Sequence, residues 1–211
     1  MKTKFDFSEV ENFDEHIHLS IPNYDGLMDV ITASFLEFMP PQGVCVDLGC
    51  STGKLIGELS KLTQGEYVGV DEVNIVENRD FTFFHGDCLD YLLNLESCDV
   101  IISCFTLQFL GTKKREQVLL QLKELVDNGA TLFLAEKTYC NSPKINTILW
   151  REHIRQKRKS FTDTQILDKD YDLFGSMFCK TDSEIKDELS SLGKATQIWQ
   201  SYNFKCWIIT N

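Results

Sequence analysis

The sequence predicts an α/β protein with a doubly wound, largely parallel sheet, and three features lead to this prediction. An apolar run at 44–48 is followed by a Gly-x-x-x-Gly turn and then by helix formers at 54–61. Apolar runs and helical patterns then alternate as far as residue 137, which is typical of a parallel sheet covered by helices. Two strand-like runs at 196–202 and 205–210 end the chain and predict an antiparallel hairpin.

The strand at 44–48 and the turn after it form the first unit of the predicted sheet. Its fourth residue, Asp47, is polar and is not explained by an apolar run. Gly49 and Gly53 carry no Cβ, so we expect the backbone there to come close to a ligand. In open α/β sheets, ligands bind beyond the carboxyl ends of the strands, which is where this turn lies. The alternative is a glycine turn in an α/β protein of another function.

Two other glycine motifs do not fit this turn. A phosphate-binding loop ends in Gly-Lys-Ser or Gly-Lys-Thr, whereas Gly53 and Lys54 precede Leu55 and the glycine spacing differs. The dinucleotide fingerprint G-x-G-x-x-G needs a second glycine two residues after the first, where this chain has Ser51. The turn therefore matches neither a phosphate loop nor a dinucleotide-binding loop.

Acidic residues follow the next two predicted strands. The strand at 66–71 ends in Asp71, about 20 residues past the glycine turn, a position suited to accepting both hydroxyls of a ribose. Glu72 lies beside that position. The third strand and its loop span 81–90 and include Asp87 in a Gly-Asp turn. The alternative interpretation of each carboxylate is a solvated strand end or turn.

The remaining predicted elements flank and extend this sheet. A helix begins near Tyr24, after a polar and acidic segment, and ends before Pro40. Beyond residue 143 the chain is mostly helical until the terminal hairpin. Between these parts, the pattern predicts a strand and loop at 98–110, a long amphipathic helix at 113–126 and a fifth strand at 131–137.

Basic residues gather in the helical part of this otherwise acidic chain. Arg151, Arg155 and Arg158 share one helical stripe, with Lys157 and Lys159 beside them. This stripe predicts an anion site over the ligand-binding edge of the sheet, suited to a carboxylate or phosphate substrate. The alternative is a solvated helix face.

The composition excludes several classes of protein. The 211 residues are 43% hydrophobic and suit one globular domain. A formal net charge of -11 argues against non-specific nucleic-acid binding. No apolar run reaches the ~18 residues of a membrane span, and the start lacks the apolar core of a signal peptide. The eight cysteines include no C-x-x-C pair, so we expect no metal site. We therefore expect a cytoplasmic protein with no membrane partner. The small-molecule substrate that we also expect follows from the predicted anion site.

The segment Asp47-Leu48-Gly49-Cys50-Ser51-Thr52-Gly53 resembles the first motif of the class I S-adenosylmethionine (SAM)-dependent methyltransferases. This resemblance implies a seven-stranded, Rossmann-like sheet closed by the antiparallel hairpin. It also implies that Asp87 accepts a hydrogen bond from the exocyclic amine of adenine and that Cys88 packs on the ring. We expect one domain, 1–211, made of an N-terminal cap at 1–40, a cofactor-binding core at 41–140, a helical lid at 141–190 and the closing hairpin at 191–211.

Further motifs narrow the resemblance to carboxy-SAM synthase, a family of the tRNA wobble-uridine modification pathway. The most specific motif is Phe105-Thr106-Leu107-Gln108-Phe109-Leu110. The matching blocks follow one another in the family's order along nearly the whole chain. Besides the glycine turn, they are Phe13-Asp14-Glu15, Ser20-Ile21-Pro22-Asn23-Tyr24, Ala135-Glu136-Lys137 and the segments 179–183 and 199–204.

The resemblance implies a pocket for SAM, carboxy-SAM or S-adenosylhomocysteine, and a small anionic co-substrate such as prephenate. By analogy it also implies a homodimer, and it predicts no direct contact with nucleic acid. The positions that match or adjoin cofactor contacts of the family are Tyr24, Asp47, Gly49, Cys50, Ser51, Gly53, Asp71, Glu72, Asp87, Cys88 and Cys104.

Glu72 stands where the family usually has Asn, although it could still accept a hydrogen bond from a ribose hydroxyl, and two further departures are more serious. Cys104 stands where the family has Asn, and a thiol is a poor hydrogen-bonding group. Local alignment places Asp170 where the family has an Arg that pairs with the transferred carboxylate. An anion at that position repels a carboxylate instead of attracting it. Arg155 or Arg158, on the nearby helix, is a possible replacement for the missing cation.

Three functions stay open at this point. The chain is a carboxy-SAM synthase-like transferase that uses SAM and a small anionic co-substrate, or a diverged or ordinary SAM-dependent methyltransferase, or a non-catalytic SAM-binding partner protein. Carboxyl transfer needs a cationic clamp for a carboxylate. Methyl transfer needs an in-line nucleophile about 3 Å from the sulfonium methyl. The missing Arg favours a diverged methyltransferase. The retained lid and terminal motifs favour the substrate pocket of the carboxy-SAM synthase family.

Overall fold

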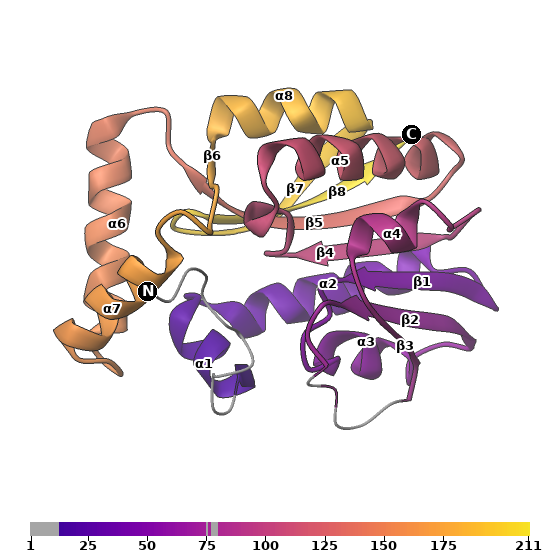
Figure 1. Ribbon diagram of the computed structural model, residues 1–211, viewed down its shortest axis with the longest axis horizontal. Coiled ribbons are helices and arrows are strands. Elements are labelled where there is room, and N and C mark those ends of the chain that lie inside the picture. Colours follow the sequence, from indigo (N-terminus) through magenta and orange to yellow (C-terminus); the bar gives the residue numbers. More distant parts are fainter. Residues whose placement is uncertain (1–12, 75, 77–79) are drawn as a thin grey trace.

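The computed structural model describes residues 13–74, 76 and 80–211, which form a central sheet with helices on both faces (Figure 1). Residues 1–12 of the predicted N-terminal cap lie outside this described part. The sheet has eight strands, and its main path runs in the order β3-β2-β1-β4-β5-β8-β7. The bounds are Gly43–Leu48 for β1, Gly65–Asp71 for β2, Thr82–His85 for β3, Val100–Cys104 for β4, Thr131–Tyr139 for β5, Lys180–Thr181 for β6, Lys194–Ser201 for β7 and Phe204–Thr210 for β8.

The strand directions confirm the predicted doubly wound sheet with a terminal hairpin. Strands β1 to β5 are parallel, and β8 runs antiparallel to both β5 and β7. Strands β2 and β3 lie on one side of β1, whereas β4 and β5 lie on the other. The order in which strands are added to the sheet therefore reverses at the boundary between β1 and β4. In open parallel sheets, this point leaves a crevice at the carboxyl ends of the strands.

The prediction of seven strands missed β6. Its two residues pair with Thr138 and Tyr139 at the end of β5, outside the main path of the sheet. A strand of two residues cannot show an alternating apolar pattern, so the sequence carries no signal for it.

The helices follow the sequence pattern wherever a full apolar face exists. Helix α2 begins at Tyr24, as predicted, and buries Leu27, Ile31 and Phe35. Helices α1 and α4 were not predicted, because α1 lies in a polar, acidic segment and α4 is too short to show a period. No helix in the described ranges is long and apolar enough to cross a membrane. The bounds are Phe13–Ser20 for α1, Tyr24–Phe38 for α2, Lys54–Leu59 for α3, Cys88–Leu92 for α4, Thr112–Asp127 for α5, Pro143–Lys157 for α6, Asp163–Leu173 for α7 and Asp182–Leu192 for α8, with a 3₁₀ turn η2 at Leu107–Phe109.

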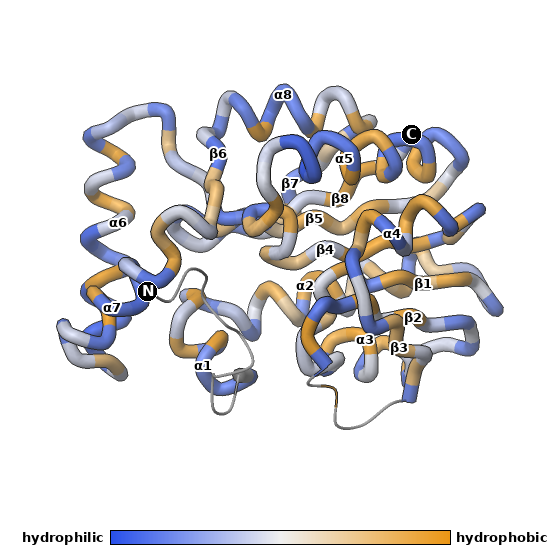
Figure 2. The backbone as a smooth tube through the Cα atoms, in the orientation of Figure 1, coloured by the Kyte–Doolittle hydropathy of each residue, from blue (hydrophilic) through white to orange (hydrophobic). Residues whose placement is uncertain are grey.

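Alternate strand residues pack into two separate core layers. On β1, Cys45 packs with α2 and α3, whereas Val46 packs with α4, α5 and α8. On β4, Ile102 and Ile101 divide between the same two layers. Because both faces are covered, the inner strands β1 and β4 and the first part of β5 are mostly apolar, and Figure 2 shows orange segments along them.

Helices α1, α6 and α7 stand beyond the carboxyl ends of the parallel strands (Figure 1). Ser142 caps α6, with Pro143 in its first turn, and a capping box between Thr162 and Gln165 begins α7. The range predicted as a lid, 141–190, also includes most of α8. That helix instead packs on the sheet in the same layer as α5.

Candidate functional site

A cavity of about 800 Å³ lies at the carboxyl ends of β1, β2 and β4. One side, which we call the strand half, is lined by residues from these strand ends and the loops that follow them. The opposite side, the helix half, is lined by residues of α1, α6 and α7 together with Lys137. The predicted site residues that line the cavity are Tyr24, Asp47, Gly49, Cys50, Ser51, Asp71, Glu72, Cys88, Cys104 and Asp170. Gly53, Asp87 and the three arginines do not line it.

The two glycines of the turn are required by internal packing. Both adopt positive φ, 77° at Gly49 and 79° at Gly53, which favours glycine. A Cβ on Gly49 would collide with the side chain of Thr106, and one on Gly53 would collide with the ring of Phe81. The space that a Cβ of Gly53 would occupy is therefore filled by a protein ring, and the predicted close approach of this glycine to a ligand stays a prediction. Gly49 does line the cavity, yet its missing Cβ makes room for Thr106.

Asp71 holds the glycine turn and the tip of β2 together. Its Oδ2 accepts a hydrogen bond from the backbone N–H of Ser51 at 2.8 Å, and its Oδ1 accepts one from Val73 at 2.8 Å. Each carboxylate oxygen keeps a lone pair for a ligand in the cavity. Ser51 has φ 53°, an uncommon value for a non-glycine residue, and its Oγ is buried without a hydrogen-bond partner among the described residues. A turn held in this way is preorganised for a polar ligand.

Asp47 is a buried carboxylate at the floor of the strand half. Its side chain is only 3% exposed. Burial, followed by the negative charge of Asp71, raises the pKa of Asp47 to about 7. A cationic ligand group beside Asp47 would stabilise its charged form and so lower this pKa.

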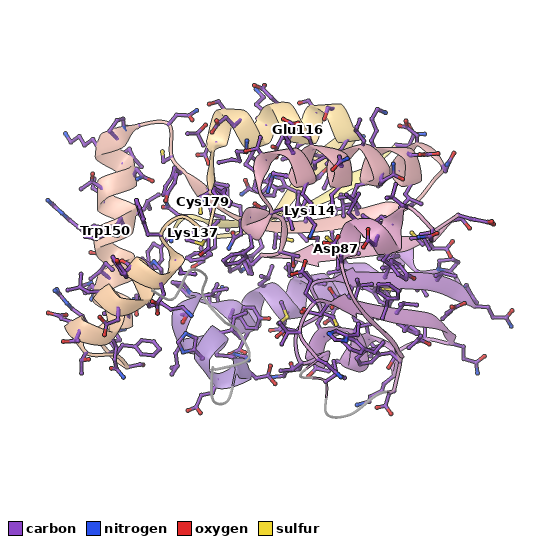
Figure 3. All side chains as sticks on the ribbon, viewed as in Figure 1. Asp87, Lys114, Glu116, Lys137, Trp150 and Cys179 are labelled. Carbon is purple, nitrogen blue, oxygen red and sulfur yellow. The ribbon has the colours of Figure 1, made fainter. Side chains whose placement is uncertain are left out.

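Lys114 lines the cavity and was not predicted from the sequence. Its Nζ contacts Glu72 Oε1 at 3.0 Å and also Asp87 Oδ2, so the ammonium bridges two carboxylates that were predicted to face the adenosine (Figure 3). Asp87 also caps α4 by accepting from the N–H of Leu89 at 2.8 Å. Burial raises the pKa of Asp87. Lys114 and the backbone N–H donors lower it by more than burial raises it, so the pKa of Asp87 lies below its ordinary value. No spacing rule connects Lys114 to the acids, because it comes from α5.

The loop after β4 closes the floor of the cavity with strained backbone. Phe105 has φ 58°, and the hydroxyl of Thr106 donates to the carbonyl of Leu48 at 2.9 Å, joining the ends of β4 and β1. Such backbone outliers cluster at functional sites. Burial, then Cys206 and Asp47, raises the pKa of Cys104 well above its usual range, so this residue is a neutral thiol.

Lysines line the helix half of the cavity. Lys137, at the end of β5, points toward the space between the sheet and α6 (Figure 3). Lys157 of α6 and Lys169 of α7 also line the cavity. Burial lowers the pKa of Lys157, and burial followed by Lys157 lowers the pKa of Lys169 to about 8. Asp170 lies 3.9 Å from Lys157 and offsets part of this positive charge.

The predicted arginine stripe lies on the outer face of α6. Arg155 pairs with Glu152 at 2.8 Å, and the exposed Arg158 pairs with Asp163 at 2.7 Å. Arg151 is also exposed. The face that α6 buries carries His153 and Lys157, one helical turn apart. The prediction of an anion site built from these arginines, including the use of Arg155 or Arg158 as a replacement cation, is therefore wrong. The periodicity showed which residues share a stripe but not which stripe faces the cavity.

A buried ion-pair network supports the floor beneath Lys137. Arg115 is 2% exposed and contacts Glu136 Oε2 at 3.2 Å and Glu188 Oε2 at 2.7 Å. Burial raises the pKa of Glu136 to about 7 despite the neighbouring guanidinium. Gln108 accepts from the backbone N–H of Lys137 at 2.9 Å. These contacts fix the end of β5, from which Lys137 enters the cavity.

The two halves of the cavity offer different chemistry. The strand half presents carboxylates suited to hydroxyl and ammonium groups, whereas the helix half presents ammonium groups suited to an anion. Within the described ranges, no group of three His, Cys, Asp or Glu side chains is placed to hold a metal ion.

Comparison with known proteins shows similarity to methyltransferases. A sequence profile described as a methyltransferase domain matches residues 45–129, which run from β1 to the end of α5. The chain is 26% identical to carboxy-S-adenosyl-L-methionine synthase of Pseudomonas aeruginosa (strain UCBPP-PA14) over 97% of this chain and 92% of that protein. It is also 26% identical to the enzyme of the same name from Hydrogenovibrio crunogenus, over 97% of this chain and 88% of the other.

Solved structures show the same fold. A SAM-dependent methyltransferase from Archaeoglobus fulgidus superposes with a TM-score of 0.64 at 12% identity, covering 95% of this chain and 100% of the other. The plantazolicin methyltransferase BpumL, solved with S-adenosylhomocysteine (SAH), superposes with a TM-score of 0.67 at 14% identity, covering 97% of this chain and 92% of the other. These likenesses confirm the α/β fold in which the cavity lies.

Proposed function

We propose that the strand half of the cavity binds SAM and that the helix half binds a small anionic co-substrate. The proposal starts from the similarity of residues 45–129 to a methyltransferase domain and of nearly the whole chain to carboxy-SAM synthases. The observation that carries the proposal is the set of three lysines, Lys137, Lys157 and Lys169, that line the cavity opposite the strand ends. In a chain with a formal net charge of -11, this is a local reversal of charge.

The polar groups of the strand half match the polar groups of SAM. Asp71 has lone pairs left to accept the two ribose hydroxyls, and Glu72 lies beside it. The buried carboxyl of Asp47 suits the methionine ammonium, because a cation stabilises its charged form. Ser51, which lines the cavity next to Asp71, lies beside the position proposed for the methionine part of SAM. Asp87 and Cys88 flank the position proposed for the adenine.

The lysines of the helix half favour an anion. Lys157 is 8% exposed and is partly stripped of water, so a bound carboxylate or phosphate would replace lost solvation with a charge-assisted hydrogen bond. Lys169 and Lys137 border the same space. Two carboxylates, Asp14 of α1 and Asp170 of α7, also line it, so the three lysines still outnumber the acids.

The named relatives point to carboxyl transfer as the first candidate, with a prephenate-like donor supplying the carboxyl group to the SAM methyl carbon. A specific observation favours methyl transfer as the second candidate. Asp170 lines the cavity 3.9 Å from Lys157, so part of the cationic charge that a carboxylated cofactor would need is already occupied. A non-catalytic SAM-binding role is the third candidate. The tRNA-modification context, cytoplasmic location and homodimer implied by the family resemblance stay predictions.

The first test is to release the ligand from freshly purified protein and identify it by mass spectrometry. Carboxy-SAM would support the first candidate, whereas SAM or SAH alone would favour methyl transfer. SAM is then added to ligand-free protein. At 100 times its dissociation constant, a ligand adds about 2.7 kcal/mol of stability, or about 5–10 °C in a protein of this size. No thermal shift with SAM, SAH or carboxy-SAM would refute the cofactor assignment.

The anion assignment is tested with a matched pair of variants on α6. Lys157→Gln removes a cavity ammonium, and Arg155→Gln removes an exposed cation from the outer face of the same helix. With SAH bound, prephenate and inorganic phosphate are titrated by calorimetry. We expect Lys157→Gln to weaken anion binding about 10-fold or more and Arg155→Gln to leave it unchanged. Equal affinities in the two variants would contradict the lysine site.

A further inference from the structure

Lys114 brings a cation to the end of the strand half where the adenine of SAM is proposed to lie. It lines the cavity together with Gly86 and Cys88, which flank Asp87 in the chain. Asp87 itself does not line the cavity. The family resemblance implies that Asp87 accepts a hydrogen bond from the adenine amine. At this end of the cavity the structure therefore presents an ammonium, a donor, where a carboxylate acceptor was predicted.

The oxygens of Asp87 are already engaged within the protein. Its Oδ1 accepts from the backbone N–H of Leu89 at 2.8 Å, and its Oδ2 accepts from Nζ of Lys114, which lies beside it in Figure 3. The backbone N–H of Asp90 also donates to this carboxylate. A carboxylate has about four lone pairs, so these donors use most of its capacity. Asp87 therefore serves mainly to cap α4 and to hold Lys114.

The place of Lys114 in its helix is electrostatically unfavourable. It lies in the first turn of α5, which contains no acidic residue, and the N-terminus of a helix carries a partial positive charge. Glu72, at 3.0 Å, and Asp87 compensate for this repulsion. Burial lowers the pKa of Lys114, but hydrogen bonds to Asp87 and Glu72 raise it by more, so the pKa lies above its ordinary value. Lys114 is thus a cation at neutral pH, fixed in place by two acids from other elements.

The ammonium of Lys114 keeps one N–H for a ligand. An ammonium has three N–H donors, and within the described ranges Glu72 and Asp87 are the acceptors that contact it. The side chain lines the cavity and is 28% exposed, so a ligand can reach it. A donor cannot serve the exocyclic amine of adenine, which is itself a donor. The ring nitrogens N1 and N7, on either side of that amine, are acceptors.

We propose that Lys114 determines base specificity by donating its third N–H to N1 or N7 of the adenine. This role rests on the proposed function, because it requires SAM in the strand half. Glu72 lines the same cavity beside the ammonium, so a carboxylate acceptor stands next to the donor. Such a pair complements the edge of adenine, where an amine donor adjoins a ring-nitrogen acceptor. A base without that ring nitrogen would leave the ammonium without its third acceptor.

The test removes one ring nitrogen of the ligand at a time. SAH and its 1-deaza, 7-deaza and 3-deaza analogues, in which a C–H replaces the nitrogen, are titrated into ligand-free protein by calorimetry. We expect either the 1-deaza or the 7-deaza analogue to bind about 10-fold or more weakly than SAH, because a hydrogen bond from a charged donor is lost. N3 lies on the opposite side of the ring from the amine, so the 3-deaza analogue is the control.

A matched pair of variants then assigns the lost hydrogen bond to Lys114. Lys114→Met removes the ammonium and keeps the length of the side chain, whereas Lys113→Met removes an exposed cation from the same turn of α5. The penalty of the sensitive analogue should vanish in Lys114→Met and persist in Lys113→Met, since two groups in direct contact do not have additive effects. The effect of the 3-deaza change should be the same in all three proteins. A purely structural role of Lys114 would instead weaken every ligand alike.

Two results would overturn the assignment of Lys114. One is equal binding of SAH and of the 1-deaza and 7-deaza analogues by the native chain, which needs no variant. The other is a penalty that persists in Lys114→Met, because another donor would then read the base. Lys114→Ala provides the same comparison where the methionine variant does not fold. Failure of the native chain to bind SAH would refute the proposed function, and with it this role of Lys114.

Discussion

Replacing Asp47 by Asn is expected to stabilise the ligand-free protein and to weaken SAM binding. Asp47 is 3% exposed, and burial followed by Asp71 raises its pKa from 3.8 to about 7. When the folded-state pKa of an acid is raised, the fold gains stability while the acid is protonated and loses it as pH rises through the folded pKa. At pH 8 that loss amounts to about 4 kcal/mol, since one pKa unit corresponds to about 1.36 kcal/mol. Asn keeps the shape of Asp and does not ionise, so it escapes this loss.

The assay compares the free energy of unfolding in urea for the native chain and Asp47→Asn between pH 5 and 8. The advantage of the variant should grow by about 2–3 kcal/mol across this range, because Asp47 passes from protonated to charged. Other titrating groups, including Glu136, occur in both proteins and cancel in the difference. At pH 8 the variant should also bind SAM about 10- to 100-fold more weakly, having lost a charge-assisted hydrogen bond.

A difference in stability that stays constant with pH would refute this reasoning, because it would mean that Asp47 ionises near its ordinary pKa when folded. Asp80→Asn provides the control. Its side chain is 48% exposed and pairs with Lys61 on the surface. We expect it to leave the affinity for SAM unchanged. The native protein should bind SAM more tightly as pH rises toward 8, since the ammonium prefers the charged carboxylate.

Three further predictions follow from the site. Asp71→Ala should abolish SAM binding in calorimetry, because the ribose hydroxyls lose their acceptor and the glycine turn loses its tie to β2; Asp80→Ala should bind normally, and equal affinities would contradict the ribose assignment. Arg115→Met should lower the free energy of unfolding by about 3–5 kcal/mol in urea, because it leaves a buried carboxylate without its cation; a loss below about 1 kcal/mol would mean that the network is not strongly coupled. Phosphate binding should weaken as pH rises through about 8, where Lys169, whose pKa is lowered by burial and by its neighbouring lysine, loses its charge; a flat profile would contradict its role.

The strand half of the cavity could be predicted because its residues lie at strand ends. A strand end is visible in the sequence as the last residue of an apolar run, and parallel strands place these ends at one edge of the sheet. Asp47 and Asp71 therefore lie together, as the spacing indicated, and Asp71 supports the glycine turn as well as facing the cavity.

The helix half could not be predicted in the same way. Its groups come from helices whose rotation about their own axes is set by tertiary packing. The arginine stripe of α6 and the face carrying Lys157 are equally periodic, and only burial against the rest of the chain separates them. Lys114 was missed for a related reason. It reaches the cavity from α5, and the sequence of a helix gives no distance to partners on other elements.

The hydrogen bond between His153 and the carbonyl of Ser20 joins residues 133 positions apart and links α6 to the end of α1. The helix half is thus assembled from the two chain segments that precede and follow the parallel strands. If the strand ends hold SAM as proposed, replacements on α1, α6 and α7 can alter which acceptor enters without disturbing them. A fold divided in this way lets a lineage keep one donor molecule while it exchanges acceptors, and Asp170, which the family resemblance aligns with an Arg, is predicted to be a change of that kind.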